Sequence, residues 1–232
     1  MKILDEIKSL EDIEKAKHLQ RFFKTGAGQY GEGDLFLGIN VPNVRILAKK
    51  YYKLVSYDDI QSLIESQHHE VRLLALFLMV FIYETSDSID TKKEIFHLYL
   101  KNVEYINNWD LVDLSAPKVV GNFVFEHKNF DYIYKLANSG HLWSERISVV
   151  SQHYLIKRGE FSLLLELSEK FLAHKHDLMH KGVGWMLREM GKVDEAPLYE
   201  FLDKYYKRMP RTMLRYSIER IPQVKRSYYM QK

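Results

Sequence analysis

The residue types most able to do chemistry in this chain gather in three short segments, and the first is NNWDLVD at residues 107–113. If Asn108 caps a helix that begins at Trp109, then Trp109 and Asp113 are four residues apart and lie on one face. Asp113 has apolar neighbours in the sequence, and a carboxylate in apolar surroundings is costly unless it is paired or used. Two interpretations stay open: a functional carboxylate, or an aspartate that pairs with an arginine or caps a neighbouring helix.

The second segment is LWSERI at residues 142–147. An apolar stripe begins at Trp143 and continues at helical spacing to Tyr154, and Arg146 flanks it. The planar guanidinium of Arg146 can hold a phosphate or a carboxylate through its fixed fork of donors. The alternative is an ion pair with Asp113 or Glu145 and no ligand.

The third segment is KGVGWMLRE at residues 181–189. Gly182 and Gly184 each cost a helix roughly 1 kcal/mol relative to alanine. Their presence is explained if another helix, or a ligand, must approach the backbone closely beside Trp185. Taken alone, Trp185 is most simply a core residue.

Charge is unevenly distributed along the chain. The net charge is only +3, yet residues 204–232 contain nine lysines and arginines against one acid, Glu219. Such asymmetry predicts either a polyanionic partner at the C-terminal end or a solvated surface that favours solubility.

Composition excludes several classes of site. The chain has no cysteine, so disulfides, iron–sulfur clusters and thiolate zinc sites are excluded, and a reducing cytoplasm is expected. His174, His176 and His180 cluster, but the glutamate that follows the first histidine in the HExxH helix of a metalloprotease is missing, so we interpret them as solvent-facing residues at a helix start. The N-terminal residues are too charged for a signal peptide, and the longest apolar run, residues 73–83, predicts a buried helix rather than a membrane span.

Apolar residues recur at helical spacing along most of the chain, which predicts an all-α fold. The predicted helices span residues 2–8, 10–24, 42–54, 57–66, 69–84, 90–104, 109–126, 130–138, 141–158, 160–173, 176–191, 195–209 and 210–221. Helix pairs recur about every 35–40 residues, the length of HEAT-like units, which stack into a solenoid (an α-α superhelix) with a concave face. We expect a single domain over residues 1–232 with a basic concave face. A closed helical bundle is the alternative.

Local signals mark some of the boundaries between these helices. Ser9, followed by Asp12, offers an N-cap for the second helix, and Pro42 in the first turn opens the third. Residues 25–40 hold five of the eleven glycines, which predicts an ordered, sharply turning connection. This loop lacks the Lys-Ser/Thr of a phosphate-binding loop, so nucleotide binding is not expected there.

Together, the three segments resemble the AlkD family of DNA alkylation repair glycosylases. The resemblance extends from about Gln20 to Arg220 and includes FLGI at 36–39, WDLVD at 109–113, LWSER at 142–146 and GWMLRE at 184–189, in matching order and spacing. It implies a HEAT-like solenoid that excises N3- and N7-alkylated purines from double-stranded DNA in the cytoplasm, near the nucleoid. It also implies a catalytic set without cofactor or metal, which falls on Trp109, Asp113, Arg146 and Trp185.

The implied chemistry is reasonable for these residue types. An N3- or N7-alkylated purine is cationic and leaves readily, and a carboxylate can stabilise the oxocarbenium-like sugar that remains. Indole faces attract cationic groups, and an arginine can hold the adjacent phosphate. The residues expected to contact DNA are Arg146, Lys181, Arg188, Arg211 and Arg215.

One position departs from the family pattern. A tyrosine that can face the lesion is replaced here by Phe22, so stacking on the lesion would remain and the hydroxyl would be lost. A non-catalytic HEAT-like module that binds DNA structures or proteins is the rival interpretation.

Overall fold

The computed structural model describes residues 2–231, and they form two compact units, one up to Val119 and one from Val120. The secondary structure of these residues is helical, apart from one isolated parallel bridge between Leu35 and His68. The all-α prediction is therefore confirmed, whereas a single domain over residues 1–232 stays a prediction. Between residues 2 and 231, no helix has the length and apolar character needed to cross a membrane.

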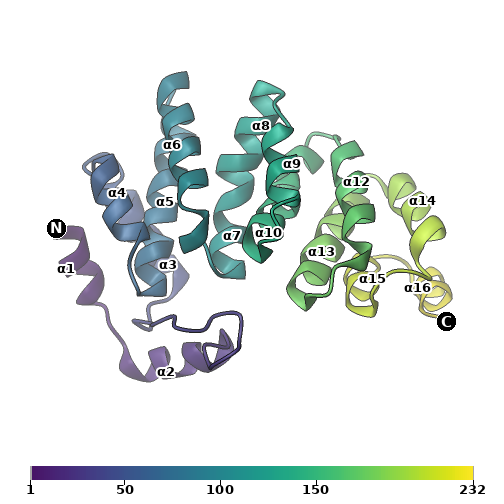
Figure 1. The fold of residues 1–232 in the computed structure, drawn as a ribbon, viewed down its shortest axis with the longest axis horizontal. Coiled ribbons are helices and arrows are strands. Elements are labelled where there is room, and N and C mark those ends of the chain that lie inside the picture. The colour runs from purple at the N-terminus through teal and green to yellow at the C-terminus, as the bar shows by residue number, and fades with distance from the viewer. Residues whose placement is uncertain (1, 232) are drawn as a thin grey trace. The chain divides into compact units, whose positions relative to one another are not determined.

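The first unit contains α1 to α7 (Figure 1). Their bounds are α1 Lys2–Lys8, α2 Ile13–Phe22, α3 Val41–Tyr51, α4 Tyr57–Ile64, α5 His69–Thr85, α6 Ile89–Lys101 and α7 Trp109–Ala116, with a 3-10 turn at Val103–Tyr105. The central element is α5, which packs against α3, α4, α6 and α7. Every residue from His69 to Val80 is buried, so the prediction of a buried helix over the long apolar run is confirmed.

The start of α2 differs from the sequence-based prediction. Ser9 does not cap α2, because its hydroxyl donates to the Glu6 carbonyl at 2.7 Å in the last turn of α1. Asp12 caps α2 instead, with its carboxylate accepting from the Lys15 N–H at 3.1 Å. The prediction for α3 is confirmed, since Pro42 lies in its first turn and Asn40 caps it.

The glycine-rich loop between α2 and α3 is ordered by contacts with α5. The Glu70 carboxylate accepts hydrogen bonds from the N–H groups of Leu37, Gly38 and Ile39, at 2.8–3.1 Å. Gly38 has a φ of +80°, and a Cβ at this position would overlap the Asp12 carbonyl. Glycine is therefore required here, and the prediction of an ordered, sharply turning connection is confirmed.

The second unit contains α8 to α16 (Figure 1). Their bounds are α8 Asn122–His127, α9 Asp131–Ala137, α10 Leu142–Val150, α11 Gln152–Ile156, α12 Ser162–Lys170, α13 Asp177–Val193, α14 Glu195–Tyr205, α15 Arg211–Ser217 and α16 Gln223–Met230, with a 3-10 turn at Phe171–Ala173. The central element is α13, which packs against α10, α11, α12, α14 and α15.

Three helix boundaries in and near the second unit correct the sequence-based prediction. The predicted helix 109–126 is interrupted by a π-helical turn at Pro117–Gly121, and a Cβ on Gly121 would overlap the Ser151 carbonyl. The predicted helix 141–158 is divided at Ser151 into α10 and α11. The last helix, α16, was not predicted; Pro222 precedes it and fixes the backbone at its start.

Candidate functional site

The first candidate pair, Trp109 and Asp113, lies on α7. The Asn108 side chain accepts a hydrogen bond from the Trp109 N–H at 2.9 Å, so the predicted cap and helix start are confirmed. Both Trp109 and Asp113 are partly exposed. They are separated by about one helical turn, which places an indole and a carboxylate on the same face of α7.

Two phenylalanines from α2 and the residue after it surround the Trp109 indole. Phe23 is buried and stacks on the indole with ring centroids 5.4 Å apart. Phe22 lies edge-on to the indole at 6.2 Å and is 57% exposed. The structure thus brings Phe22, the lesion-stacking candidate, beside Trp109 on an aromatic surface open to solvent.

Asp113 is not the buried carboxylate of α7, although its apolar neighbours suggested that it would be. It is close enough to Tyr99 that its negative charge adds to burial in raising the pKa of the Tyr99 hydroxyl. Tyr99 is fully buried and its hydroxyl is 2.9 Å from the Ser115 Oγ. The carboxylate that is buried on this helix is Asp110, at 7% exposure.

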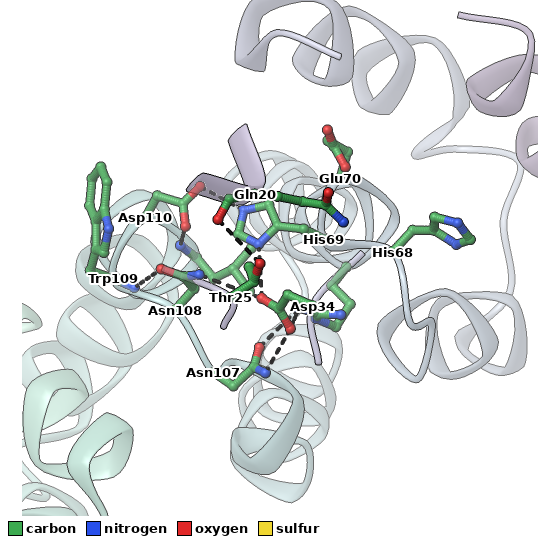
Figure 2. Close-up of polar contacts among 12 residues, drawn as sticks. Gln20, Thr25, Asp34, His68, His69, Glu70, Asn107, Asn108, Trp109 and Asp110 are labelled. Atoms are coloured by element: carbon green, nitrogen blue, oxygen red, sulfur yellow. Dashed lines mark hydrogen bonds and ion pairs between the residues drawn. The ribbon is translucent and has the colours of Figure 1, made fainter. Parts of the chain in front are cut away.

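Asp110 belongs to a largely buried polar group that we call the His69 cluster. Its members are Asp34, His69, Arg72, Asn107, Asn108 and Asp110. The Asp110 Oδ2 is 2.8 Å from the His69 Nε2, and the Asp34 Oδ2 is 3.5 Å from the His69 Nδ1. Figure 2 shows Asp34 facing both His69 and Asn107 from the glycine-rich loop. Arg72 donates to Asp34 at 2.7 Å.

Opposing effects set the charge of His69. Burial, the largest single effect, favours the neutral imidazole, but the carboxylates of Asp110 and Asp34 outweigh it and raise the pKa of His69 to about 9. The pKa of Asp34 is lowered, because His69 and Arg72 outweigh the effect of burial. His69 is therefore an imidazolium at neutral pH. Sequence analysis missed this cluster; Asp34, His69 and Arg72 have no helical spacing to Asp110, so only the fold reveals it.

In the second unit, Arg146 lies on α10 and is only 4% exposed. Its Nη1 donates to the Leu178 carbonyl at 2.5 Å. A Cβ on Gly182 would lie 3.1 Å from the same Nη1, so this glycine leaves room for the guanidinium. The neighbouring Gly184 has a different reason, because a Cβ there would lie 2.5 Å from the Met213 carbonyl oxygen on α15.

Trp185 lies on α13 and is partly exposed. Its indole Nε1 donates to the Glu189 Oε1 at 3.0 Å, and its ring lies 5.9 Å from that of His153. Burial favours protonation of Glu189, yet hydrogen bonds from Lys192 and Trp185 outweigh it and lower the pKa of Glu189. The pKa of His153 is lowered by burial and by nearby Lys157. Trp185 is thus held by a charged acceptor and is not a fully buried core residue.

The cationic candidates for DNA contacts differ in their surroundings. Lys181 pairs with Asp177 at 2.7 Å, and Arg188 pairs with Glu219. Arg211 is partly buried and donates to the Met230 carbonyl at 3.3 Å. Arg215, one turn further along α15, is exposed.

The three histidines before and within α13 all make polar contacts with other groups of the protein. The Nε2 of His174 is 3.0 Å from the Glu145 carboxylate, His176 caps α13 by accepting from the Leu178 N–H at 3.2 Å, and the Nε2 of His180 is 2.5 Å from the His174 carbonyl. All three are partly buried, so the prediction that they face solvent is wrong. Within the described part of the chain, no group of three or more metal-ligating side chains is found.

Comparison with known proteins identifies related sequences and structures. A family model described as DNA alkylation repair enzyme matches residues 3–221. A solved structure described as a predicted DNA alkylation repair enzyme from Enterococcus faecalis is similar to this chain, with a TM-score of 0.72 and 17% identity over 92% of this chain and 97% of that chain. This likeness shows the fold, and with the helical content it confirms the helical-repeat prediction. No curated protein sequence matches the chain.

Proposed function

The chain belongs to the family of DNA alkylation repair enzymes, and we propose that it is a monofunctional DNA glycosylase. Its proposed substrates are cationic N3- and N7-alkylated purines in double-stranded DNA, and the reaction hydrolyses the N-glycosidic bond. The observation that carries this proposal is the pairing of a partly exposed indole and a partly exposed carboxylate, Trp109 and Asp113, on one face of α7.

The proposed chemistry depends on where charge moves during bond cleavage. The alkylated purine already carries a positive charge and departs as a neutral base, so a strong general acid is not needed. Positive charge develops on the deoxyribose as the bond breaks. A carboxylate near that carbon stabilises the oxocarbenium-like transition state and can orient the attacking water. We assign this role to Asp113.

The other proposed roles follow from aromatic and cationic chemistry. The indole faces of Trp109 and Trp185 attract cationic groups, each contributing about 1 kcal/mol or more when water is excluded. Phe22 extends the aromatic surface beside Trp109. We propose that the buried Arg146 guanidinium turns from the Leu178 carbonyl toward DNA and holds the phosphate next to the lesion, a contact that fixes the position of the DNA without reading its sequence. The proposed reaction requires no cofactor and no metal ion.

The test is release of free base from a duplex that carries one N7-methylguanine, measured under single-turnover conditions by liquid chromatography. Asp113→Asn keeps the shape of the side chain and removes its charge, so we expect the rate to fall by about 100-fold or more. Binding to the same duplex should change little. The matched control is Asp87→Asn, at an exposed position in the loop between α5 and α6.

Three outcomes would contradict the proposal. An unchanged rate in Asp113→Asn would remove Asp113 from the reaction. Efficient release of uracil, a neutral base, would show that the chemistry is different. Tight binding of alkylated duplex by the wild-type protein without any base release would support the non-catalytic binding module instead.

A further inference from the structure

The two residues that flank Trp109 in the sequence are both anchored in the His69 cluster. Asn108, which caps α7 at Trp109, donates from Nδ2 to Asp34 at 3.5 Å. Asp110 accepts from the Leu111 N–H at 2.9 Å with one oxygen and lies 2.8 Å from the His69 Nε2 with the other. The backbone that carries the Trp109 indole is therefore fixed on both sides (Figure 2).

The indole ring is supported by the same histidine. Phe23, which stacks on Trp109, lies with its ring centroid 5.0 Å from that of His69. Phe36 stacks on His69 at 4.7 Å, and Phe23 and Phe36 belong to one apolar cluster against which Trp109 packs. His69 thus contacts both the group that fixes the Trp109 backbone and the ring that fixes its side chain.

Within the His69 cluster, the charges balance only when His69 is protonated. Asp34 and Asp110 are negative, Arg72 is positive, and all three are at least nine-tenths buried. Without its proton, His69 would leave two buried carboxylates with a single cation, which is strongly unfavourable.

Other charged groups nearby do not supply the missing charge. Glu70, next to His69 on α5, adds no positive charge and is directed to the glycine-rich loop through three hydrogen bonds. On the α2 side, Lys15 and His18 line the same cavity of about 350 Å³ as His69 and Asp110, and Lys15 pairs with Asp12. The positive charge on His69 is therefore the charge that neutralises the buried Asp110 carboxylate and holds it in position.

We infer that His69 is a positioning residue: through Asp110 and Phe23 it holds the Trp109 indole in the orientation that base release requires. This inference rests on the proposed glycosylase function only for the effect on base release, because the orientation of Trp109 can be measured without any reaction. A displacement of about 1 Å in a reacting group can slow an enzyme about 100-fold. Loss of the His69 charge should therefore lower the rate much more than it lowers DNA affinity.

The first experiment observes Trp109 directly. The chain contains three tryptophans, so incorporation of 5-fluorotryptophan gives three 19F resonances, and Trp109→Phe identifies the one from Trp109. We expect this resonance to shift between pH 7 and 10 with a midpoint near 9, while those of Trp143 and Trp185 stay in place. In His69→Gln the Trp109 resonance should already be displaced at pH 7 and should no longer respond to pH.

The second experiment measures single-turnover base release and DNA affinity. His69→Gln should slow release roughly 10- to 100-fold with affinity within about twofold. His69→Gln combined with Asp110→Asn restores the charge balance and a neutral hydrogen bond, so it should recover much of the lost rate. His68→Gln is the matched control, because the adjacent His68 makes no capping hydrogen bond and points away from the cluster (Figure 2).

The two experiments separate failure of this inference from failure of the proposed function. A Trp109 resonance that ignores pH between 7 and 10, or that titrates equally in His69→Gln, would overturn the positioning role whatever the activity. If the resonance behaves as expected but the wild-type protein releases no base, the structural link holds and the glycosylase proposal fails. Loss of DNA affinity in step with the rate would also overturn a role specific to Trp109.

Discussion

Raising the pH from about 6 to about 9.5 should remove a defined part of the folding stability, and His69 is the residue responsible. Burial alone would lower the pKa of His69, but its carboxylate partners raise it from 6.5 to about 9. Each unit corresponds to about 1.4 kcal/mol, so protonation of His69 in the folded state contributes about 3 kcal/mol. Because the folded pKa is the higher one, this contribution is complete below pH 6.5, declines as the pH rises, and is gone above about pH 9.

The assay is urea unfolding followed by far-ultraviolet circular dichroism at several pH values, on wild type and His69→Gln. Groups that titrate in both proteins cancel in the difference, so the free energy of unfolding of the wild type minus that of the variant isolates His69. This difference should shrink by about 3 kcal/mol from pH 6 to 9.5, and His68→Gln should follow the wild type throughout. Parallel stability curves for wild type and His69→Gln would refute the charged state assigned to His69.

Three further predictions follow from contacts elsewhere. Gly184→Ala places a methyl 2.5 Å from the Met213 carbonyl oxygen and should lower the free energy of unfolding in urea by about 2 kcal/mol. Gly26→Ala, where the new methyl faces only a flexible glutamine, should change it by no more than about 0.5 kcal/mol. Equal effects of the two substitutions would contradict the packing argument. Glu70→Gln weakens three hydrogen bonds to the glycine-rich loop and should lower the free energy of unfolding by about 2 kcal/mol. The direct readout is faster amide hydrogen exchange at residues 37–39. Unchanged exchange there would show that the carboxylate does not order the loop. Arg215→Ala should reduce the slope of log affinity for duplex DNA against log salt by about one unit, and an unchanged slope would assign this exposed charge to solubility alone.

The helical fold was predictable because its signals are local. The Asn108 cap and the start of α7 at Trp109 follow from a side chain and its immediate neighbour, and the buried position of α5 follows from a long run of apolar residues. The same local reasoning missed α16, which begins directly after Pro222. It also failed at Gly121, where the close approach of the Ser151 carbonyl accompanies a π-helical turn.

The candidate site was predictable only in part. Sequence motifs pointed to Trp109 and Asp113, and α7 does carry them on one face. The support beneath them was not predictable, because Asp34 and His69 are separated from Asp110 by many residues and meet it only through the folding of the glycine-rich loop over α5. No periodicity in the sequence indicates that residues so far apart along the chain will come into contact.

Two carboxylates about one turn apart on α7, Asp110 and Asp113, have different surroundings and therefore different expected roles. Asp110 is buried, and a buried charge is tolerated only when a partner neutralises it, which here is the His69 imidazolium. Its charge is balanced in the folded state, so it has little field left for a ligand. Asp113, three residues later, is partly exposed on the face that carries the Trp109 indole. A carboxylate at this partly exposed position can approach the positive charge that develops on a bound sugar. This contrast is why Asp110→Asn should act on stability and on the Trp109 orientation, while Asp113→Asn should act on the rate of base release.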